Sequence, residues 1–232
     1  MAQINKNFEF EQGGKTYSLY DLPAGFVIKG KLLLSGKELD KLPNLSRVIV
    51  EGDFFCSNNN LTDLEGAPQK VGGTFYCGDN NITSLEGCPR EVGGDFYCCD
   101  NQLTSLKGGP QKVGGSFFCY NNKLTDLKGI AGEIGGRISC HGNQLESLFI
   151  SPPQKDELAI LCDRKIAEKY GLADSMTYGR LKATTLYAVQ LHAYMIVNKK
   201  HLDRVREGEE RKNRLKSGFA PFKEKRAKER EE

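Results

Sequence analysis

Residues 54–74 have the sequence FFCSNNNLTDLEGAPQKVGGT, and residues 75–95 continue with FYCGDNNITSLEGCPREVGGD. The same 21-residue step returns at 96–116 and 117–137, and it brings five columns of residues into register. The columns are Phe54, Phe75, Phe96, Phe117 and Ile138; Cys56, Cys77, Cys98, Cys119 and Cys140; Asn59, Asn80, Asn101, Asn122 and Asn143; Leu61, Ile82, Leu103, Leu124 and Leu145; and Leu64, Leu85, Leu106, Leu127 and Leu148. A fixed internal period of this length predicts a solenoid whose repeats stack on one another.

Within one repeat, the residues around Phe54 alternate as in a short β-strand. Phe54 and Cys56 are expected to point into the core and Phe55 outward, with strands of successive turns pairing in parallel about 4.8 Å apart. The asparagine column is expected to bond free backbone groups where the strand turns, and Gly72-Gly73 to supply positive φ angles. The five column cysteines are predicted to be reduced, buried and free of metal, whereas Cys99 has the outward phase and should be exposed.

The run Phe54-x-Cys56-x-x-Asn59-x-Leu61 resembles the L-x-L-x-x-N-x-L core of the leucine-rich-repeat family, with Phe and Cys in place of the first two Leu. The resemblance covers roughly Val27 to Pro153, about half of the chain, and the short unit resembles repeats of bacterial and phage proteins. It implies an α/β repeat solenoid with a parallel β stack on one side. For function it implies a non-enzymatic binding scaffold.

The flanking segments depart from the repeat and predict four regions. Residues 1–26 alternate around Gly13-Gly14 and predict an N-terminal β-hairpin cap, followed by the solenoid over 27–153. Residues 154–207 predict a C-terminal α-helical region, with one helix over 155–171 and a second from about Thr177 towards Val205. These helices pack either on the solenoid or on a second copy of the chain, as a homo-oligomer. Residues 208–232 predict a charged, basic and flexible tail.

The composition is that of a soluble protein, with 27% charged and 38% hydrophobic residues and a net charge of +3. From Lys199 to Glu232 there are 13 Lys and Arg against 8 Asp and Glu, so the rest of the chain, with 20 against 22, is mildly acidic. No apolar run is long enough to span a membrane, and the first residues lack the apolar segment of a secretory signal. We therefore expect a cytoplasmic protein with no membrane contact.

The residues that carry enzyme chemistry do not form a known motif. Cys98-Cys99 cannot chelate zinc as paired C-x-x-C motifs do, and the glycine pairs lack the Lys-Ser/Thr of a phosphate loop. Cys162-Asp163 lacks the spacer of the Cys-x-Asp site in the ubiquitin ligases that some bacterial repeat proteins carry. The three histidines are scattered. The sequence therefore predicts no enzyme, no cofactor and no metal site.

An outward column of aromatic residues is the main candidate site. It comprises Phe55, Tyr76, Tyr97 and Phe118, ends at Ser139, and is flanked by Asp53, Asp79, Asp95, Asp100, Tyr120, Asn121 and His141. On the concave face of a solenoid, exposed aromatic residues framed by polar ones are typical of a protein interface. The predicted partner-binding residues are Phe55, Tyr76, Tyr97, Phe118, Tyr120, Asp95, Asp100 and His141. In the simpler interpretation, the rings only stabilise the sheet by stacking.

The acidic neighbours of this column indicate a protein partner with a basic patch. The resemblance to phage and bacterial repeats suggests an adaptor or an inhibitor of a host protein. The alternative is a nucleic-acid-associated protein that binds through the basic C-terminal helix and tail.

Overall fold

The computed structural model describes residues 8–148, 157–163, 166 and 180–182. All of them belong to the first of two compact units, Met1–Gln190, and the second unit, Leu191–Glu232, lies outside the described residues. The predicted basic tail and most of the predicted C-terminal helical region therefore also lie outside them.

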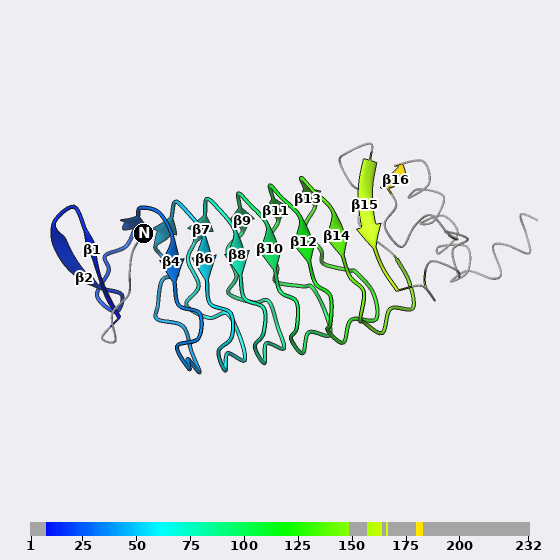
Figure 1. Cartoon of the computed structure of the whole chain (residues 1–232), viewed down its shortest axis with the longest axis horizontal. Helices are drawn as coiled ribbons and strands as arrows, with labels where there is room; N and C mark the ends of the chain where they lie inside the picture. Colours follow the sequence, from blue (N-terminus) through cyan, green and yellow to red (C-terminus); the bar gives the residue numbers. More distant parts are fainter. Residues whose placement is uncertain (1–7, 149–156, 164–165, 167–179, 183–232) are drawn as a thin grey trace, which may run out of the picture. The chain divides into compact units, whose positions relative to one another are not determined.

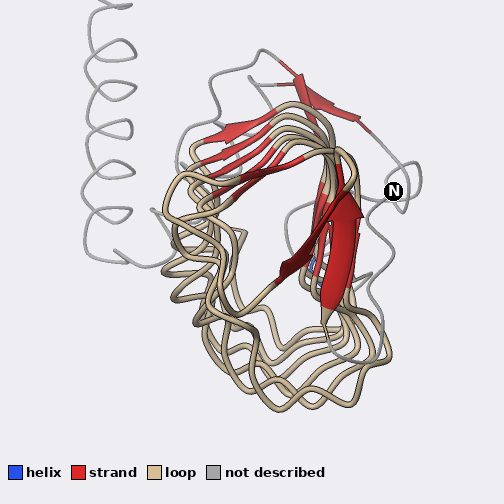
Figure 2. Cartoon of the chain, turned by 90° about the vertical axis from the view of Figure 1, so that its left-hand side faces the viewer, coloured by secondary structure: helices blue, strands red, loops and turns tan. Residues whose placement is uncertain are grey.

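Two sheets build the solenoid, and their strands pair in parallel except for β15 and β16, which are antiparallel (Figure 1). The eight-stranded sheet contains β4 (Leu32–Leu33), β6 (Phe54–Phe55), β8 (Phe75–Tyr76), β10 (Phe96–Tyr97), β12 (Phe117–Phe118), β14 (Ile138–Ser139), β15 (Glu157–Leu161) and β16 (Arg180–Lys182). The six-stranded sheet contains β3 (Val27–Ile28), β5 (Ile49–Val50), β7 (Lys70–Val71), β9 (Glu91–Val92), β11 (Lys112–Val113) and β13 (Glu133–Ile134). Seen along the stack, successive coils superimpose, with the two sheets on different sides of each coil (Figure 2). The sequence predicted one sheet on one side, so the second sheet was missed.

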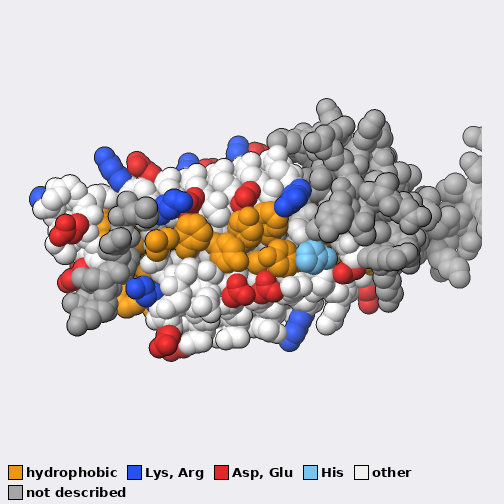
Figure 3. Space-filling model, in the orientation of Figure 1, with side chains coloured by type: hydrophobic (Ala, Val, Ile, Leu, Met, Phe, Trp, Pro, Cys, Tyr) orange, Lys and Arg blue, Asp and Glu red, His pale blue; other side chains and the backbone are white. Residues whose placement is uncertain are grey.

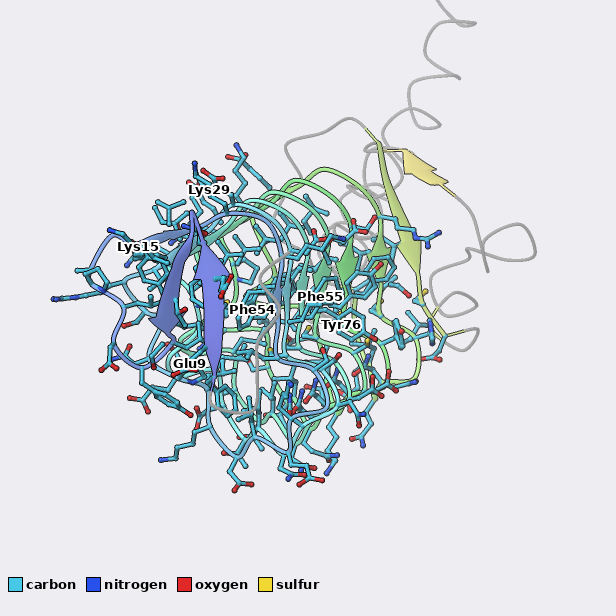
Figure 4. The ribbon with its side chains drawn as sticks, turned by 60° about the vertical axis from the view of Figure 1, so that its left-hand side comes forward. Glu9, Lys15, Lys29, Phe54, Phe55 and Tyr76 are labelled. Carbon is cyan, nitrogen blue, oxygen red and sulfur yellow. The ribbon has the colours of Figure 1, made fainter. Side chains whose placement is uncertain are left out.

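The predicted core columns are confirmed. Phe54, Phe75 and Phe96 are fully buried and stack with ring centroids 5.3 and 5.5 Å apart. Parallel pairing aligns Phe54 with Phe75 and Phe55 with Tyr76, so that one ring of each turn faces the core and the next lies on the outer surface (Figure 4). The five column cysteines are also fully buried, and all eight cysteines are thiols rather than disulfides.

The asparagine ladder forms as predicted. Asn101 Nδ2 donates to the carbonyl oxygens of Cys98 and Cys99 in its own turn at 3.3 and 3.0 Å, and to that of Cys77 in the preceding turn at 3.1 Å. Its Oδ1 accepts from the backbone N–H of Ile82 at 2.9 Å. Each asparagine thereby satisfies backbone groups of two turns and fixes the register between them.

The glycine pairs were predicted to supply positive φ angles, but they do not. Gly72-Gly73 and their copies have no positive φ; these angles fall instead at Gly66, Gly87, Gly108 and Gly129, at the end of the Leu-x-x-Leu segment. The paired glycines lie at the corner between the two sheets, where a Cβ on Gly93 would clash with the carbonyl oxygen of Gly72. Corner amides bond from turn to turn, as Gly94 N–H does to Gly73 O at 2.9 Å. The corner requires glycine because the stacked backbones leave no room for a side chain.

The predicted N-terminal hairpin is present as β1 (Glu9–Gln12) and β2 (Lys15–Ser18), an antiparallel pair joined through Gly13-Gly14. Phe10 is buried against Tyr17 and Phe26. The Gln12 side chain donates to Val27 O at 2.9 Å and accepts from Lys29 N–H at 2.7 Å, so its amide binds the backbone of β3 and its neighbour. The hairpin thus packs against the first turn of the solenoid.

The C-terminal prediction is wrong for most of what the structure describes of this segment. Within the helix expected over 155–171, Glu157–Leu161 form the strand β15, whereas Ile166 is helical; of the helix expected from Thr177 only Arg180–Lys182 are described, and they form the strand β16. β15 pairs in parallel with β14, which aligns Ile160 with Ile138 and places Ile160 and Cys162 in the buried core. The apolar residues of this segment have helical spacing, but pairing with the edge of the existing sheet outweighs that local preference.

No helix within the described part of the chain is both long and apolar enough to cross a membrane.

Candidate functional site

The predicted aromatic column forms one continuous surface on the eight-stranded sheet. We call Phe55, Tyr76, Tyr97 and Phe118 the aromatic strip; they occupy equivalent positions of β6, β8, β10 and β12. Figure 3 shows this band of apolar side chains along the outer face, with acidic groups on both sides and a histidine at one end. Leu33 of β4 pairs with Phe55, is 37% exposed and lengthens the apolar row by one turn.

Tyr76, Tyr97 and Phe118 stack on one another, and Phe55 lies tilted beside Tyr76 with ring centroids 6.4 Å apart, so the rings are less exposed than predicted. Ring centroids lie 4.8 Å apart between Tyr76 and Tyr97 and 4.2 Å apart between Tyr97 and Phe118, with interplanar angles of 29° and 8°. Phe55, Tyr76 and Tyr97 are half-buried, and Phe118 is only 8% exposed. The expectation that all four face solvent freely is wrong, because each ring covers its neighbour.

Cations cover the two outer ring faces of the stack. Lys31 Nζ lies 5.9 Å from the Phe55 centroid, on the side away from Tyr76, and Arg137 Cζ lies 5.4 Å from the Phe118 centroid. Lys31 also pairs with Asp53 at 2.7 Å, and this contact, followed by the backbone hydrogen bond from Thr74, lowers the pKa of Asp53. The strip therefore presents ring edges to solvent and has no uncovered ring face at either end.

A second pair of rings lies beside the strip. Tyr120 and His141 stack at 4.8 Å with an interplanar angle of 9°. Tyr120 and Tyr76 both interact with the Cys99 thiol, so this thiol lies between the pair and the strip. Gly78 lies one turn before Cys99 in the same column, and a Cβ there would come within 3.0 Å of both Cys99 Sγ and the Tyr76 ring.

The prediction that Cys99 is exposed is therefore wrong: it is fully buried beneath these tyrosines. Burial raises the pKa of the Cys99 thiol to about 11. The hydrogen bond to Cys99, followed by burial, raises the pKa of Tyr120, and burial raises that of Tyr76. At neutral pH the thiol and both phenols are uncharged, so Cys99 has none of the thiolate character that a nucleophile requires.

The carboxylates beside the strip differ in their environment. Asp95 Oδ1 accepts from Ser116 N–H in the next turn at 2.6 Å and Oδ2 accepts from Tyr97 OH at 3.4 Å, so Asp95 holds the corner of a turn. Asp79 and Asp100 lie on the other side of the strip, in left-handed backbone conformations with φ of 56° and 54°. Asp100 Oδ1 accepts from Asn121 Nδ2 at 2.8 Å, and Asp79 is exposed to solvent.

The structure thus brings all eight predicted site residues to one face of the sheet, in two stacked groups flanked by carboxylates. The prediction omitted Leu33, Lys31, Arg137 and Cys99. Lys31 and Arg137 occupy the same repeat position as Asp53 and Asp95, and this register could have shown that they lie at the ends of the strip. The stacking of the rings depends on side-chain rotamers, which the sequence pattern does not specify.

Within the described residues, no group of three or more His, Cys, Asp or Glu side chains is placed to hold a metal ion.

Comparison of the chain with protein-family models, curated proteins and solved structures gave no match to any of them.

Proposed function

We propose that this protein is a non-enzymatic binding scaffold that recognises a protein partner through the aromatic strip and its acidic border. The observation that carries the proposal is the continuous row of ring edges from Phe55 to Phe118, framed by carboxylates on a rigid, hydrogen-bonded stack. An apolar row with a charged rim is typical of protein interfaces, where Tyr is enriched. Such a scaffold would act as an adaptor or an inhibitor.

We also propose that the solenoid is a divergent leucine-rich repeat. The support is the turn formed by Asn59 and Leu61, in which the Asn59 amide donates to Cys56 O at 3.0 Å and the Leu61 N–H donates to the next asparagine of the ladder at 3.1 Å. The second sheet, in place of a convex helix, would follow from the shortness of the unit.

The test is a pull-down from the native host with the full chain, compared with a Tyr76→Ala/Tyr97→Ala variant. The matched control is Tyr20→Ala, because Tyr20 is 62% exposed and lies beyond the hairpin strand β2, away from the strip. A partner retained by the wild type and the control, and lost by the double variant, supports the proposal. If a partner binds all three equally, the strip is only sheet packing.

The alternative function, nucleic-acid binding through the tail, makes a different prediction. It requires retention on DNA or RNA that falls steeply with salt and disappears when residues 208–232 are removed.

A further inference from the structure

We propose that the aromatic strip binds an extended polypeptide segment bearing Arg or Lys, which lies along the stacking axis with its cationic groups at Asp79 and Asp100. This inference rests on the function proposed above and specifies the chemistry of the partner.

The arrangement of the rings excludes ligands that must stack on an aromatic face. Each inner ring has a neighbour on both sides, and the outer faces of Phe55 and Phe118 are covered by Lys31 and Arg137. A nucleobase needs an open ring face to stack on, and so does a guanidinium that binds by a cation–π contact. Ring edges and phenol hydroxyls remain, which suit aliphatic groups and hydrogen-bonding chains.

The charges beside the strip favour a cationic partner. Asp79 and Asp100 occupy equivalent positions of successive turns, about 4.8 Å apart along the stack, and no Lys or Arg of the described residues forms an ion pair with either. Other exterior carboxylates, such as Asp53 and Glu91, do have such a partner. Two like charges on adjacent turns repel each other, and a cation placed against them relieves this repulsion.

The dimensions of the strip favour a single extended chain. Its four rings cover three inter-strand steps, roughly 14 Å, and an extended chain rises about 3.3 Å per residue, so four or five residues span the strip. The apolar row is one ring wide, and carboxylates follow directly beside it. A Lys or Arg side chain matches this profile because its aliphatic stem can lie on ring edges while its charged end reaches the carboxylate.

Sequence positions within the repeat supply an isosteric variant. Asn58 and Asn121 occupy the same repeat position as Asp79 and Asp100 and adopt the same left-handed conformation, with φ of 53° and 52°. An Asp79→Asn/Asp100→Asn variant therefore removes two charges without demanding a new backbone angle. The matched control is Glu65→Gln/Glu86→Gln, since these two exposed carboxylates also lie on successive turns but on the loop side of the solenoid.

The experiment titrates the full chain with a fluorescent peptide of alternating Arg and Val, about eight residues long, and with the same peptide carrying Glu for Arg. We expect only the Arg peptide to bind. The Asp79→Asn/Asp100→Asn variant should bind it about tenfold or more weakly, whereas the control should bind it as the wild type does. At high salt the difference between the variant and the wild type should shrink. Tyr76→Ala/Tyr97→Ala should also weaken binding of the Arg peptide.

Equal affinity of the Asp79→Asn/Asp100→Asn variant and the control for the Arg peptide would overturn the inference. An affinity that Tyr76→Ala/Tyr97→Ala leaves unchanged would overturn it too. Binding of a DNA oligonucleotide that depends on the tyrosines would overturn it as well. If the pull-down partner is lost with Tyr76→Ala/Tyr97→Ala but retained with Asp79→Asn/Asp100→Asn, the proposed function stands and this inference fails.

Discussion

The carbonyl oxygen of the first glycine in a corner pair lies where the equivalent glycine of the next turn would carry a Cβ, as for Gly72 and Gly93. Two other residue positions are equally constrained, for different reasons. The asparagine ladder supplies side-chain amides to buried backbone groups. One further position of the repeat adopts a left-handed conformation that Asn and Asp tolerate, at Asn58, Asp79, Asp100 and Asn121. The repeated sequence is thus fixed by backbone requirements as much as by core packing.

A Gly93→Ala substitution should lower the free energy of unfolding by about 1–3 kcal/mol, because a backbone atom must move to make room. The control is Gly132→Ala, where the nearest atom to a Cβ is Gln111 O at 4.0 Å. Urea denaturation measures both variants. Equal stability of the two would mean that the corners can open without loss.

Replacing Asn101 by Ala should destabilise the fold by about 2–4 kcal/mol, since the substitution leaves several buried carbonyl and amide groups without a partner. Gln102→Ala is the comparison, because Gln102 is adjacent and exposed. Thermal melting of both variants gives the answer, and a loss below 1 kcal/mol for Asn101→Ala would contradict the assigned role.

Cysteine labelling should begin at Cys88, since its side chain is the least buried thiol among the described residues. Its reaction should still be slow, because burial raises the pKa of this thiol as well. Mass-spectrometric mapping after short exposure to iodoacetamide identifies the first site. Modification of Cys99 or a core-column cysteine before Cys88 would show that the tyrosine cover opens readily.

At the scale of elements, the outer face of the six-stranded sheet carries an alternating charge column. Lys70, Glu91, Lys112 and Glu133 occupy equivalent positions of successive strands, with ion pairs of 3.0 Å between Lys70 and Glu91 and 2.8 Å between Lys112 and Glu133. The contact with Lys70 lowers the pKa of Glu91, and the contact with Glu133 raises that of Lys112. These pairs are exposed and screened by solvent, so each adds little to stability.

A Glu91→Lys variant places three lysines in a row and should lower the melting temperature at low ionic strength. The decrease should shrink in 1 M salt, where screening acts over about 3 Å. A Lys70→Glu/Glu91→Lys double variant restores one opposite pair and should recover part of the loss. A decrease that persists unchanged in high salt would point to packing rather than charge.

At the scale of the whole molecule, each turn of a solenoid is stabilised by packing against its neighbours. The last turn has a neighbour on one side only, so its exposed core and strand edge need a cap. β15 supplies one by continuing the eight-stranded sheet beyond β14, and Asp163 Oδ1 accepts from Gly142 N–H at 3.0 Å. Ile160 and Cys162 continue the core columns of Ile138 and Cys140. Residues 157–163 therefore close the last turn of the repeat.

Removing the Ile160 side chain in Ile160→Ala should destabilise the protein by about 2 kcal/mol or more. It should also increase hydrogen exchange of the amides in β14, its direct neighbour. Gln144→Ala, an exposed substitution in the same end turn, is the control. Unchanged exchange in β14 would show that β15 adds nothing to the stack.

The repeat pattern by itself determined the solenoid, the parallel register, the inward phase of Phe54 and Cys56 and the asparagine ladder. These features depend on local alternation and on a fixed period, which a sequence displays directly. The same alternation placed Phe55 and Tyr76 on one outer row and so identified most of the candidate site. The hairpin around Gly13-Gly14 was also predictable, because both glycines favour the turn.

Tertiary structure alone decided the rest. The glycine corners reflect the distance between stacked backbones, which no single repeat encodes. Cys99 is buried because two tyrosines from neighbouring turns close over it, although its strand phase points outward. Residues 157–161 have helical spacing yet form a strand, because the open edge of β14 offers backbone hydrogen bonds that local propensity cannot outweigh.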